Sequence, residues 1–565
     1  MANKTNRRSP GKGTMRGFMK AAVAAGLALA LGGQAFAVED FICFWGGNAS
    51  GSWSQTDPAN TGSKTPGWWD RTVPPDGVGD VPDDVDLLDG TNVTARVQSM
   101  TGNSITLDSN RTVGRLWYNW DGSSSYNLTA KGSFTLNASG GSVLTLARED
   151  ATPQIHIGYR FAQNNYNIGV TINAPLAGTQ GFTVGSPGTV AYGGFGLVLG
   201  GANTLSGTIS GFRLLTLKNE LAAQNAALSI NGTSTLRLRH DTDNATFSSA
   251  GIVVNAMSTS GGATINVDRN TADGETGHRL ILGGPITVSG QDRIKTLSIT
   301  GDNGYSLELT GGYTNTFASK PSRIDADSAN VALSGSTHDL GGGLVLGGAL
   351  ATGINTMAGT ICGAGGITKT NDATWALTGA NAFTGPSSIS GGNLLIDGGS
   401  IGTTETGDDA VSVNAGGTLG GDGGTVFADV AVAGSGAIAP GSVDDAGSLI
   451  GTLTIGGAAQ AATVGFADNA VLAIDVGSAA ADLLVVKGAV ALGATADDDV
   501  NLVVRDLVES TGLEYKILEA DGGIAIPGTL TVSGSTTMTR YALRENNTQL
   551  WLKHEPPPGT VIWIN

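Results

Sequence analysis

One stretch of this 565-residue sequence concentrates the residue types that acid–base chemistry needs. Between Asn270 and Lys295 the chain carries Asp273 and His278, followed by Arg293. A carboxylate and an imidazole can exchange protons with a substrate, and neighbouring cations can bind an anionic substrate. The short motifs NTAD, GHR and RIK in this stretch are therefore the first candidates for chemistry.

These three motifs resemble, in order, the NTD, GHG and RIK signatures of polygalacturonase-type hydrolases. In that family, paired carboxylates protonate the glycosidic oxygen and activate water, while basic residues bind uronate. This sequence departs from the family, because Ala272 interrupts the first motif, the Asp-Asp pair is absent and Arg279 breaks the second. The motifs also fall within little more than one coil of a repetitive fold, whereas converging groups must come from successive coils. We therefore predict polar turn residues and a surface strand here, with no catalytic residues.

The other candidates for chemistry are weaker. The remaining histidines lack the spacing of a zinc site, and we expect them at the surface or at corners. They are His156, His240, His338 and His554. The stretch GGSIG at 398–402 fits GxSxG, but no helix-forming run follows it, so a plain turn is predicted. In LWYNWDG, Trp117, Tyr118 and Trp120 could form a sugar-stacking platform, although the first two would point to opposite faces of a strand.

A run of aspartates offers the hard oxygen ligands that calcium prefers. The run consists of Asp76, Asp80, Asp83, Asp84, Asp86 and Asp89. It lacks the DxDxDG loop, and no GGxGxDxUx array occurs in the chain. A solvated loop that leads into a strand is the favoured interpretation, with calcium as the alternative. We predict no cofactor and no structural metal.

Composition indicates an all-β protein with many turns. The chain has 88 glycines, 14% charged residues and 40% hydrophobic residues, so it can bury a core, while so much glycine disfavours long helices. The formal charge is −17, and the first 37 residues contain six cations and no acid. Removal of that segment would leave −23, a surface that repels nucleic acid. We therefore expect no nucleic-acid partner.

The N-terminus has the pattern of a secretory signal. A basic stretch precedes the apolar run AAVAAGLALAL at 21–31, and AFA precedes the predicted cleavage between Ala37 and Val38. We expect export by the Sec pathway to the cell surface or the medium, with the periplasm as an alternative. Arg7-Arg8 leaves a twin-arginine signal open. No later stretch is long and apolar enough for a membrane helix, so the mature chain should not span a membrane.

Four regions are expected after the signal peptide of residues 1–37. A Trp- and Asp-rich cap at 38–91 should cover the first layer of a stacked fold, because an open end exposes strand edges. Residues 92–460 should form the stacked coils, 461–555 a C-terminal β region and 556–565 a short tail. The only two cysteines, Cys43 and Cys362, are interpreted as unrelated buried thiols, although a disulfide is not ruled out.

Internal repeats favour a solenoid over a sandwich. LVLGGANTLSGTISG at 197–211 matches WALTGANAFTGPSSISGG at 375–392, and LELTGGYTNTF at 307–317 is a weaker copy. In NLLIDGG, alternation places Leu394 and Ile396 on one face and Leu395 on the other. Each coil of about 20–25 residues would bury its inward side chains against its neighbours.

The best copy, at 363–399, resembles the autotransporter-associated β-strand repeat, also called the passenger-associated transport repeat. The matching residues are Gly366, Lys369, Leu377, Thr378, Gly379, Asn381, Phe383, Thr384, Gly385, Gly392 and Leu394. Trp375 and Pro386 depart from the usual pattern. The stretch from Gly451 to about Leu552 also resembles the tail of such passengers.

The resemblance implies a right-handed parallel β-helix with an N-terminal cap and a C-terminal cap-like β region. It implies a surface-displayed or secreted passenger with a structural or adhesive role and no catalysis, whose partners could be extracellular glycans or cell-surface components. A polysaccharide-binding or polysaccharide-cleaving β-helix is one alternative. Full autotransporters end in a membrane barrel, which this sequence does not show. A passenger whose barrel is lost or encoded separately is therefore the second alternative.

Overall fold

The computed structural model describes residues 41–46, 51–53, 67–70, 90–97, 103–118, 133–149, 151–157, 169–185, 196–256, 262–290, 295–403, 410–444, 447–507, 514–535 and 538–554. The chain divides into a unit of residues 1–40, which falls outside that description, and a unit from Phe41 to Asn565. Every regular element in the described residues is a strand, from β1 to β54. Among them there is consequently no helix able to cross a bilayer. The predicted all-β class is confirmed.

The strands form four long sheets and one hairpin. Sheet I contains, in spatial order, β3 (Gly67–Asp70), β1 (Phe41–Gly46), β4 (Gly90–Val97), β6 (Arg111–Tyr118), β9 (Gln154–Ile157), β12 (Gly181–Gly185), β14 (Ser206–Ser210), β16 (Ala223–Asn231), β19 (Ser249–Ala256), β22 (Ile286–Gly290), β25 (Tyr313–Asn315), β28 (Thr337–Asp339) and β31 (Thr360–Cys362), with β8 (Leu144–Leu146) and β11 (Leu176–Ala177) beside it. Sheet II contains β2 (Gly51–Ser52), β5 (Asn103–Leu107), β7 (Phe134–Ala138), β10 (Gly169–Ile172), β13 (Gly196–Leu199), β15 (Leu214–Leu217), β17 (Thr235–Arg239), β20 (Ala263–Asp268), β23 (Lys295–Gly301), β26 (Ser322–Ala326), β29 (Leu344–Gly347), β32 (Ile367–Lys369), β34 (Ser387–Ile389), β37 (Val411–Val413), β40 (Val430–Val432), β45 (Val464–Phe466), β48 (Val490–Leu492) and β51 (Ile524–Ala525).

The remaining sheets begin later in the chain. Sheet III contains β18 (Ala245–Phe247), β21 (Arg279–Leu282), β24 (Ser306–Leu309), β27 (Val331–Leu333), β30 (Ile354–Met357), β33 (Thr374–Leu377), β35 (Gly392–Ile396), β38 (Gly417–Gly421), β41 (Ala437–Pro440), β46 (Val471–Val476), β49 (Asp499–Asp506) and β52 (Thr529–Ser533). Sheet IV contains β36 (Ser400–Ile401), β39 (Gly424–Val426), β44 (Thr452–Ile455), β47 (Leu483–Val486), β50 (Glu514–Ala520), β54 (Gln549–His554) and β53 (Met538–Arg544), and β42 (Ser442–Asp444) with β43 (Gly447–Leu449) forms the hairpin.

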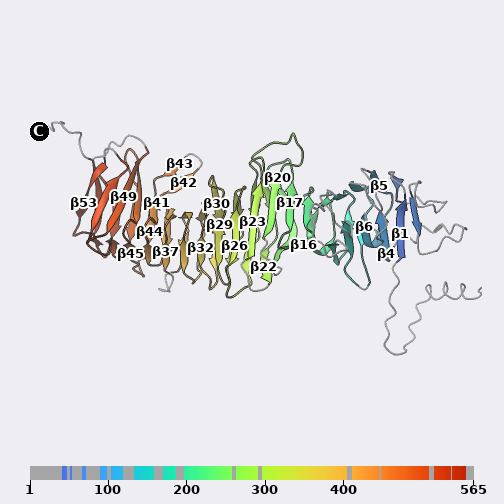
Figure 1. Ribbon diagram of the computed structural model, residues 1–565, viewed down its shortest axis with the longest axis horizontal. Coiled ribbons are helices and arrows are strands. Elements are labelled where there is room, and N and C mark those ends of the chain that lie inside the picture. Colours follow the sequence, from blue (N-terminus) through green and yellow to red (C-terminus); the bar gives the residue numbers. More distant parts are fainter. Residues whose placement is uncertain are drawn as a thin grey trace, which may run out of the picture. The chain divides into compact units, whose positions relative to one another are not determined.

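Successive coils pair in parallel and lie side by side (Figure 1). From β16 onward the chain visits sheets I, II and III in turn, and sheet IV replaces sheet I after β31. Coil length varies: 19 residues separate the paired Trp375 and Leu394, and 34 separate Ile438 and Leu472. A chain that returns to a parallel partner once per turn, with its faces in different sheets, is a parallel β-helix, which confirms the predicted fold class. Its hand stays a prediction.

Alternation along each strand sends every second side chain into one continuous core. That core runs from Trp53 to Leu552. Leu394 and Ile396 are fully buried, as the alternation predicts. Leu395 points the other way but is also buried, at 4% exposed, because it lies against the outer surface near Gly420. Alternation alone therefore gave the direction of Leu395 and missed its burial.

Antiparallel pairing occurs at both ends of the described stack. Near the start β1 pairs antiparallel with β3 and parallel with β4, so the region predicted as a cap supplies the first strands of sheet I. Near the end β54 pairs antiparallel with β50 and β53. Parallel stacking continues from β44 through β52. The expected boundary at 460/461 is thus not marked by any change in pairing.

Glycines stack directly on one another where the chain leaves sheet III. In this glycine column, a Cβ built on any glycine after the first would fall inside van der Waals contact of the carbonyl oxygen of the glycine one coil earlier, and a Cβ on the first would meet the Ser249 carbonyl oxygen. The column comprises Gly284, Gly311, Gly335, Gly359, Gly379 and Gly399. Backbones approach too closely here for any side chain. The Leu-Thr-Gly ending of the repeat therefore reflects a steric requirement of the corner.

Replacement of Gly359 by alanine should be markedly destabilising. Gly359 has φ +80° and would direct a Cβ into the Gly335 carbonyl, whereas Gly416 has φ +81° with nothing within 4 Å of its Cβ position. Gly416→Ala should cost about 1 kcal/mol from the left-handed backbone alone. Gly359→Ala should cost roughly twice as much or more, since a steric clash is added. Urea unfolding of both variants tests this, and equal costs would contradict the steric role of the column.

Candidate functional site

The residues singled out between Asn270 and Lys295 lie at opposite edges of sheet II. Asp273 and His278 belong to the loop between β20 and β21, at the carboxyl end of the strands. Lys295 begins β23, a seven-residue strand that is parallel to β20. The two ends of such a strand lie roughly 20 Å apart. Arg293 falls outside the described residues, and the others do not converge on one substrate position.

Two carboxylates in the turn between β17 and β18 accept hydrogen bonds from backbone N–H groups of the β20–β21 loop and of β21. Asp241 Oδ1 accepts hydrogen bonds from the N–H of Asn270 (2.8 Å) and Thr271 (3.0 Å), and Asp243 Oδ1 accepts from the N–H of Arg279 (2.8 Å). Partial burial raises the pKa of Asp241, but these hydrogen bonds outweigh it and the net pKa is lowered. The Arg279 N–H lowers the pKa of Asp243. Both groups therefore stay ionised and act as acceptors, unlike a general acid, whose pKa must be raised.

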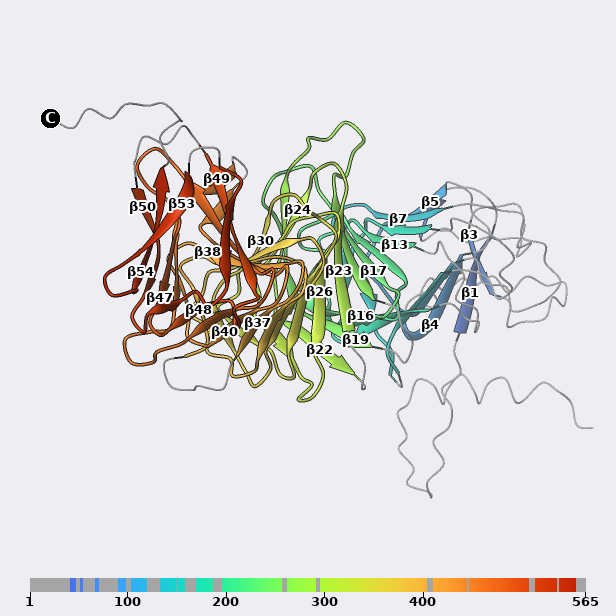
Figure 2. The same ribbon diagram turned by 60° about the vertical axis from the view of Figure 1, so that its left-hand side comes forward.

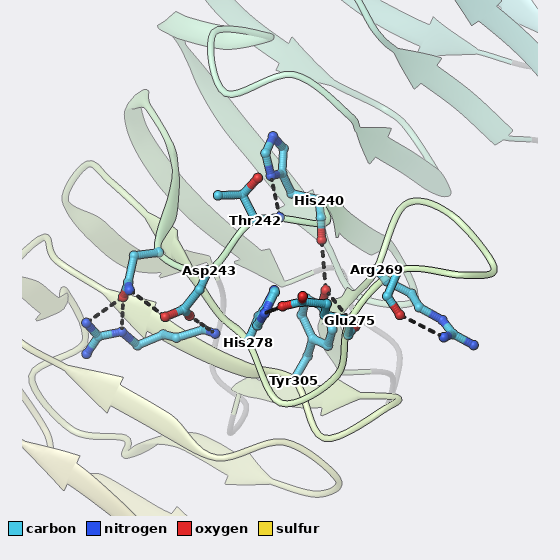
Figure 3. A network of polar contacts seen from close by, with 10 residues as sticks. His240, Thr242, Asp243, Arg269, Glu275, His278 and Tyr305 are labelled. Atoms are coloured by element: carbon cyan, nitrogen blue, oxygen red, sulfur yellow. Dashed lines mark hydrogen bonds and ion pairs between the residues drawn. The ribbon is translucent and has the colours of Figure 1, made fainter.

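Tyr305 ties three coils together at the same corner (Figure 3). Its hydroxyl donates to the carbonyl oxygens of His240 (3.1 Å) and Glu275 (3.3 Å), which come from the two preceding coils. The ring of His278 lies 5.6 Å from the Tyr305 ring, and its Nε2 contacts Glu275 Oε2 at 3.0 Å. Tyr305 is 1% exposed. The imidazole and the phenol thus serve as parts of a corner anchor.

The loop between β20 and β21 is fixed by a hydrogen bond within the loop, and its tip is exposed. Arg269 Nη1 donates to the Gly274 carbonyl (3.0 Å), and Asp273 and Glu275 are exposed. Carboxylates that cleave a glycosidic bond must flank one substrate position, and Asp241 and Asp243 instead bind the backbone. The network has the geometry of a polar turn that braces a projecting loop.

Ser400, the central residue of GGSIG, lies in strand β36 and not in the plain turn that we expected. Its Oγ accepts a hydrogen bond from the Asn381 N–H (3.0 Å). Pairing of 400–401 with β39 accounts for the strand. A hydroxyl held in this way contributes to stacking, and among the described residues that follow it no helix forms a nucleophile elbow.

The aromatic residues of β6 are divided between the two faces, as alternation predicts. Tyr118 is buried, with its ring 5.6 Å from that of Phe134, while Trp117 faces outward and is only partly buried. Trp117 stacks on His156 of the next coil at 5.2 Å. Burial, together with the smaller effect of the Arg115 charge, lowers the pKa of His156 to about 4. An uncharged aromatic pair therefore lies on the outer face of sheet I. Trp120 falls outside the described residues.

Several expectations concern residues outside the described ranges. These are the cleavage site Ala37–Val38, the aspartates Asp76, Asp80, Asp83, Asp84, Asp86 and Asp89, and the interpretation of 1–37 as a signal. Within the described ranges, no three His, Cys, Asp or Glu side chains are grouped so as to hold a metal ion.

Cys362 is a free thiol. It is partly exposed and not buried as expected, because it lies in the outward series of β31. Ten strands of sheet I separate β1, which contains Cys43, from β31. At ~4.8 Å per strand the two cysteines lie roughly 50 Å apart, far beyond the reach of a disulfide within the chain.

The side chain of Asn381, a residue of the repeat signature, makes hydrogen bonds that a strand would otherwise make in the stack. The segment 378–386 has no strand of its own, yet it lies between β31 and β36. Asn381 Oδ1 accepts the Ile361 N–H (3.0 Å) from the preceding coil, and Nδ2 donates to the Ser400 carbonyl (2.7 Å) in the following coil. The side-chain amide thus takes the place of a peptide group in the ladder. Asn381 is 2% exposed.

Two other asparagines bridge neighbouring coils in the same way. Asn203 belongs to the other GAN copy, and Asn355 lies in β30; both are buried. The contacts are Leu176 N–H to Asn203 Oδ1 (2.8 Å), Asn203 Nδ2 to Ala222 O (2.8 Å), Val331 N–H to Asn355 Oδ1 (2.9 Å) and Asn355 Nδ2 to Thr374 O (2.9 Å). We call Asn203, Asn355 and Asn381 the bridging asparagines.

His338 bridges coils with an imidazole in place of an amide. Its Nδ1 accepts the Tyr313 N–H (3.2 Å), and its Nε2 donates to the Ala358 carbonyl (2.6 Å). The side chain is fully buried, so the expectation of a surface or corner histidine was wrong here. Burial lowers the pKa of His338, although the carbonyls of Ala358 and Gly335 raise it. The geometry requires the neutral tautomer that carries its proton on Nε2.

Lys369 is buried beneath the turn that follows β32. Its Nζ donates to the carbonyl oxygens of Thr370 (2.9 Å), Asn371 (2.9 Å) and Gly391 (2.8 Å). Burial lowers the pKa of Lys369 to about 8. A Cβ at Gly392 would come within 2.7 Å of Nζ. The lysine and the glycine of the signature are therefore required together.

The other signature residues also serve stacking. Leu377, Phe383 and Leu394 are fully buried. The Thr378 and Thr384 N–H groups bond to carbonyls of the preceding coil. Glycine is needed at three close backbone approaches: Gly366 against Pro386, Gly379 against Gly359 and Gly385 against Gly366. The most motif-like part of the sequence thus builds the coil itself.

Removal of the Asn381 amide should destabilise the stack. Asn381→Ala would leave the Ile361 N–H and the Ser400 carbonyl buried without partners, at a cost of about 3 kcal/mol in unfolding free energy. Asn270→Ala is the matched control, because Asn270 is exposed and should change stability by less than about 0.5 kcal/mol. Chemical denaturation measures both variants, and similar midpoints would refute the bridging role.

Acid should weaken the fold through His338. Its folded pKa lies below the reference value of 6.5, so the unfolded chain binds the proton first and stability falls as pH drops below about 6.5. His338→Asn places a bridging amide that does not titrate at this position. Urea midpoints at about pH 5 and pH 7.5 should therefore differ less in His338→Asn than in the native chain. An unchanged difference would show that His338 does not carry the acid sensitivity.

Comparisons with known proteins identify one adhesin by sequence. No family model matches the chain. The chain is 44% identical over 88 residues to the adhesin BmaC autotransporter of Brucella suis biovar 1 (strain 1330). The match covers 15% of this chain and 2% of that relative. It is therefore a local likeness to a small part of a much longer adhesin.

A structural comparison aligns the chain with the Haemophilus influenzae Hap adhesin. The alignment covers 92% of this chain and 71% of that one, at 12% sequence identity and a TM-score of 0.19. At that TM-score the superposition carries no argument, so the assignment of a parallel β-helix depends on the strand pairing described above.

Proposed function

We propose that this chain is an adhesive, non-catalytic β-helix passenger presented at a bacterial surface. One observation carries the proposal: the lysine, the asparagine and the glycines of the repeat signature all make contacts between neighbouring coils. A sequence whose signature residues serve the stacking of coils builds a long regular surface. The local likeness to an autotransporter adhesin supports the adhesive role.

Export is part of the proposal. The basic and apolar pattern of residues 1–37, followed by Ala37 and Val38, supports passage through the Sec pathway. Delivery to the outer cell surface agrees with the local likeness to an autotransporter adhesin. Extracellular glycans or host-surface components are the proposed partners.

A polysaccharide-binding role is a second candidate, and one observation favours it. Trp117 and His156 present stacked, uncharged rings on the outer face of sheet I. Flat aromatic faces suit the apolar faces of sugar rings. The Arg115 guanidinium lies 5.8 Å from the Trp117 ring and adds a donor for hydroxyl groups.

The adhesive role is tested with the chain from Val38 to Asn565. We expect it to bind host cells or an immobilised glycan array, and to release no reducing ends from pectic or other acidic polysaccharides. Glycan cleavage that Asp273→Asn or His278→Ala abolishes would overturn the proposal and make the 270–295 stretch an active site. Absence of binding to every surface would overturn the adhesive role.

A further inference from the structure

The outer face of sheet II carries two neighbouring cations without a partner in the described part of the chain. Lys218 directly follows β15, and Arg237 lies in β17, the adjacent strand. Both residues are exposed. Neither side chain makes a hydrogen bond or ion pair with any described residue. This is unusual in a chain with a formal charge of −17.

Several other cations of the described residues have carboxylate partners. Arg279 Nη1 lies 3.0 Å from Glu308 Oε2, and Arg505 Nη2 lies 2.7 Å from Asp475 Oδ2. Lys218 and Arg237 form no such ion pair with the described residues, which leaves local positive charge on an acidic molecule.

Strand register brings a third cation to the same place. Thr216 pairs with Arg237 and Leu217 with Leu238, so Lys218 lies beside Arg239 on strands ~4.8 Å apart. Leu236 and Leu238 are buried, which directs Arg237 and Arg239 outward. We call Lys218, Arg237 and Arg239 the basic patch. Burial lowers the pKa of Arg239, and the adjacent Arg237 charge lowers it further, while Asp268 and Asp302 raise it.

The face beside the basic patch is flat toward β13. Its outward positions there are Gly196, Val198 and Gly200, which project little or nothing above the sheet. The turned view shows β13, β17, β23 and β26 along one sheet (Figure 2). On the intervening strand β15, Leu214 lies over Gly196, with its Cδ2 3.3 Å from a Cβ built there, so an extended chain lying across these strands would pass over this apolar side chain before it reaches the cations.

On the other side, Arg237 pairs in register with the neutral Asn266, and Arg239 pairs with Asp268, a carboxylate. Arg239 Nη1 donates to the Asn266 carbonyl (3.1 Å), and Asn266 Nδ2 donates to Thr300 Oγ1 (3.0 Å). Asp268 ends β20 and Asp302 directly follows β23, and both carboxylates act electrostatically on Arg239. A ligand of high, continuous negative charge would be repelled there, whereas one with separated charges and many hydroxyl groups suits the surface.

We propose that the basic patch binds an acidic glycan, with Lys218 and Arg237 contacting its carboxylate or sulfate groups. Charge-assisted contacts from ammonium and guanidinium groups fit such anions, and the flat neighbouring strands accommodate the sugar rings. The inference rests on the proposed adhesive function and names the class of its ligand.

The test uses the chain from Val38 to Asn565 with a heparin-derived octasaccharide and a galacturonate oligomer as probes, and with neutral oligosaccharides beside them. Binding should favour the acidic probes and weaken as salt rises, because exposed charges are screened. The double variant Lys218→Ala/Arg237→Ala should lose about tenfold or more in affinity. Lys320→Ala removes an exposed cation away from the patch and should leave affinity unchanged.

The outcomes separate this inference from the adhesive role itself. Equal affinity of the double variant and the native chain, or no binding of either acidic probe, would overturn the basic patch while adhesion to cells could still be intact. Tighter binding of single-stranded DNA or of anionic lipid vesicles than of any acidic glycan would overturn the ligand class. All substituted side chains are exposed, so unchanged urea midpoints should accompany the loss of affinity.

Discussion

The fold depends on one constraint: each coil must lie within hydrogen-bonding distance of the next along its whole path. Where strands pair, backbone groups satisfy each other. Where the ladder is missing or leaves backbone groups unpaired, two devices keep the same spacing. Glycine removes the side chain that would keep backbones apart, and a side-chain amide or imidazole supplies the missing donor and acceptor. The core follows from this spacing, because inward side chains of adjacent coils then touch.

Charge is distributed in agreement with the same constraint. Inside the stack, ionisable groups are used as hydrogen-bonding elements: His338 is neutral, and Lys369 is enclosed by three carbonyl oxygens. At the corners, carboxylates such as that of Asp241 accept backbone N–H groups of the next coil. Free charge is left to the outer faces, where it can meet a partner. The proposed glycan contacts depend on such cations, since Lys218 and Arg237 are exposed on the outer face of sheet II.

The sequence was sufficient for the fold class and for much of the coil. Alternation and the recurring Leu-Thr-Gly and GAN motifs arise from residues that are close in sequence, so they can be recognised from the sequence alone. His338 could not be placed in this way, because its two partners are 25 and 20 residues away and only stacking brings them to either side. The basic patch was missed for the same reason, since Lys218 and Arg237 become neighbours only through strand register. The 270–295 stretch shows the converse: residues close in sequence were carried to opposite strand ends.

Variable coil length has a further consequence. Paired positions can be separated by 19 residues in one coil and by 34 in another without loss of register. The additional residues leave the stack as loops and return to it, so the scaffold tolerates insertion as a matter of geometry. Loops can therefore be exchanged or lengthened while the stacked backbone stays constant. The same property makes the molecule a natural frame for displaying foreign peptides at fixed intervals.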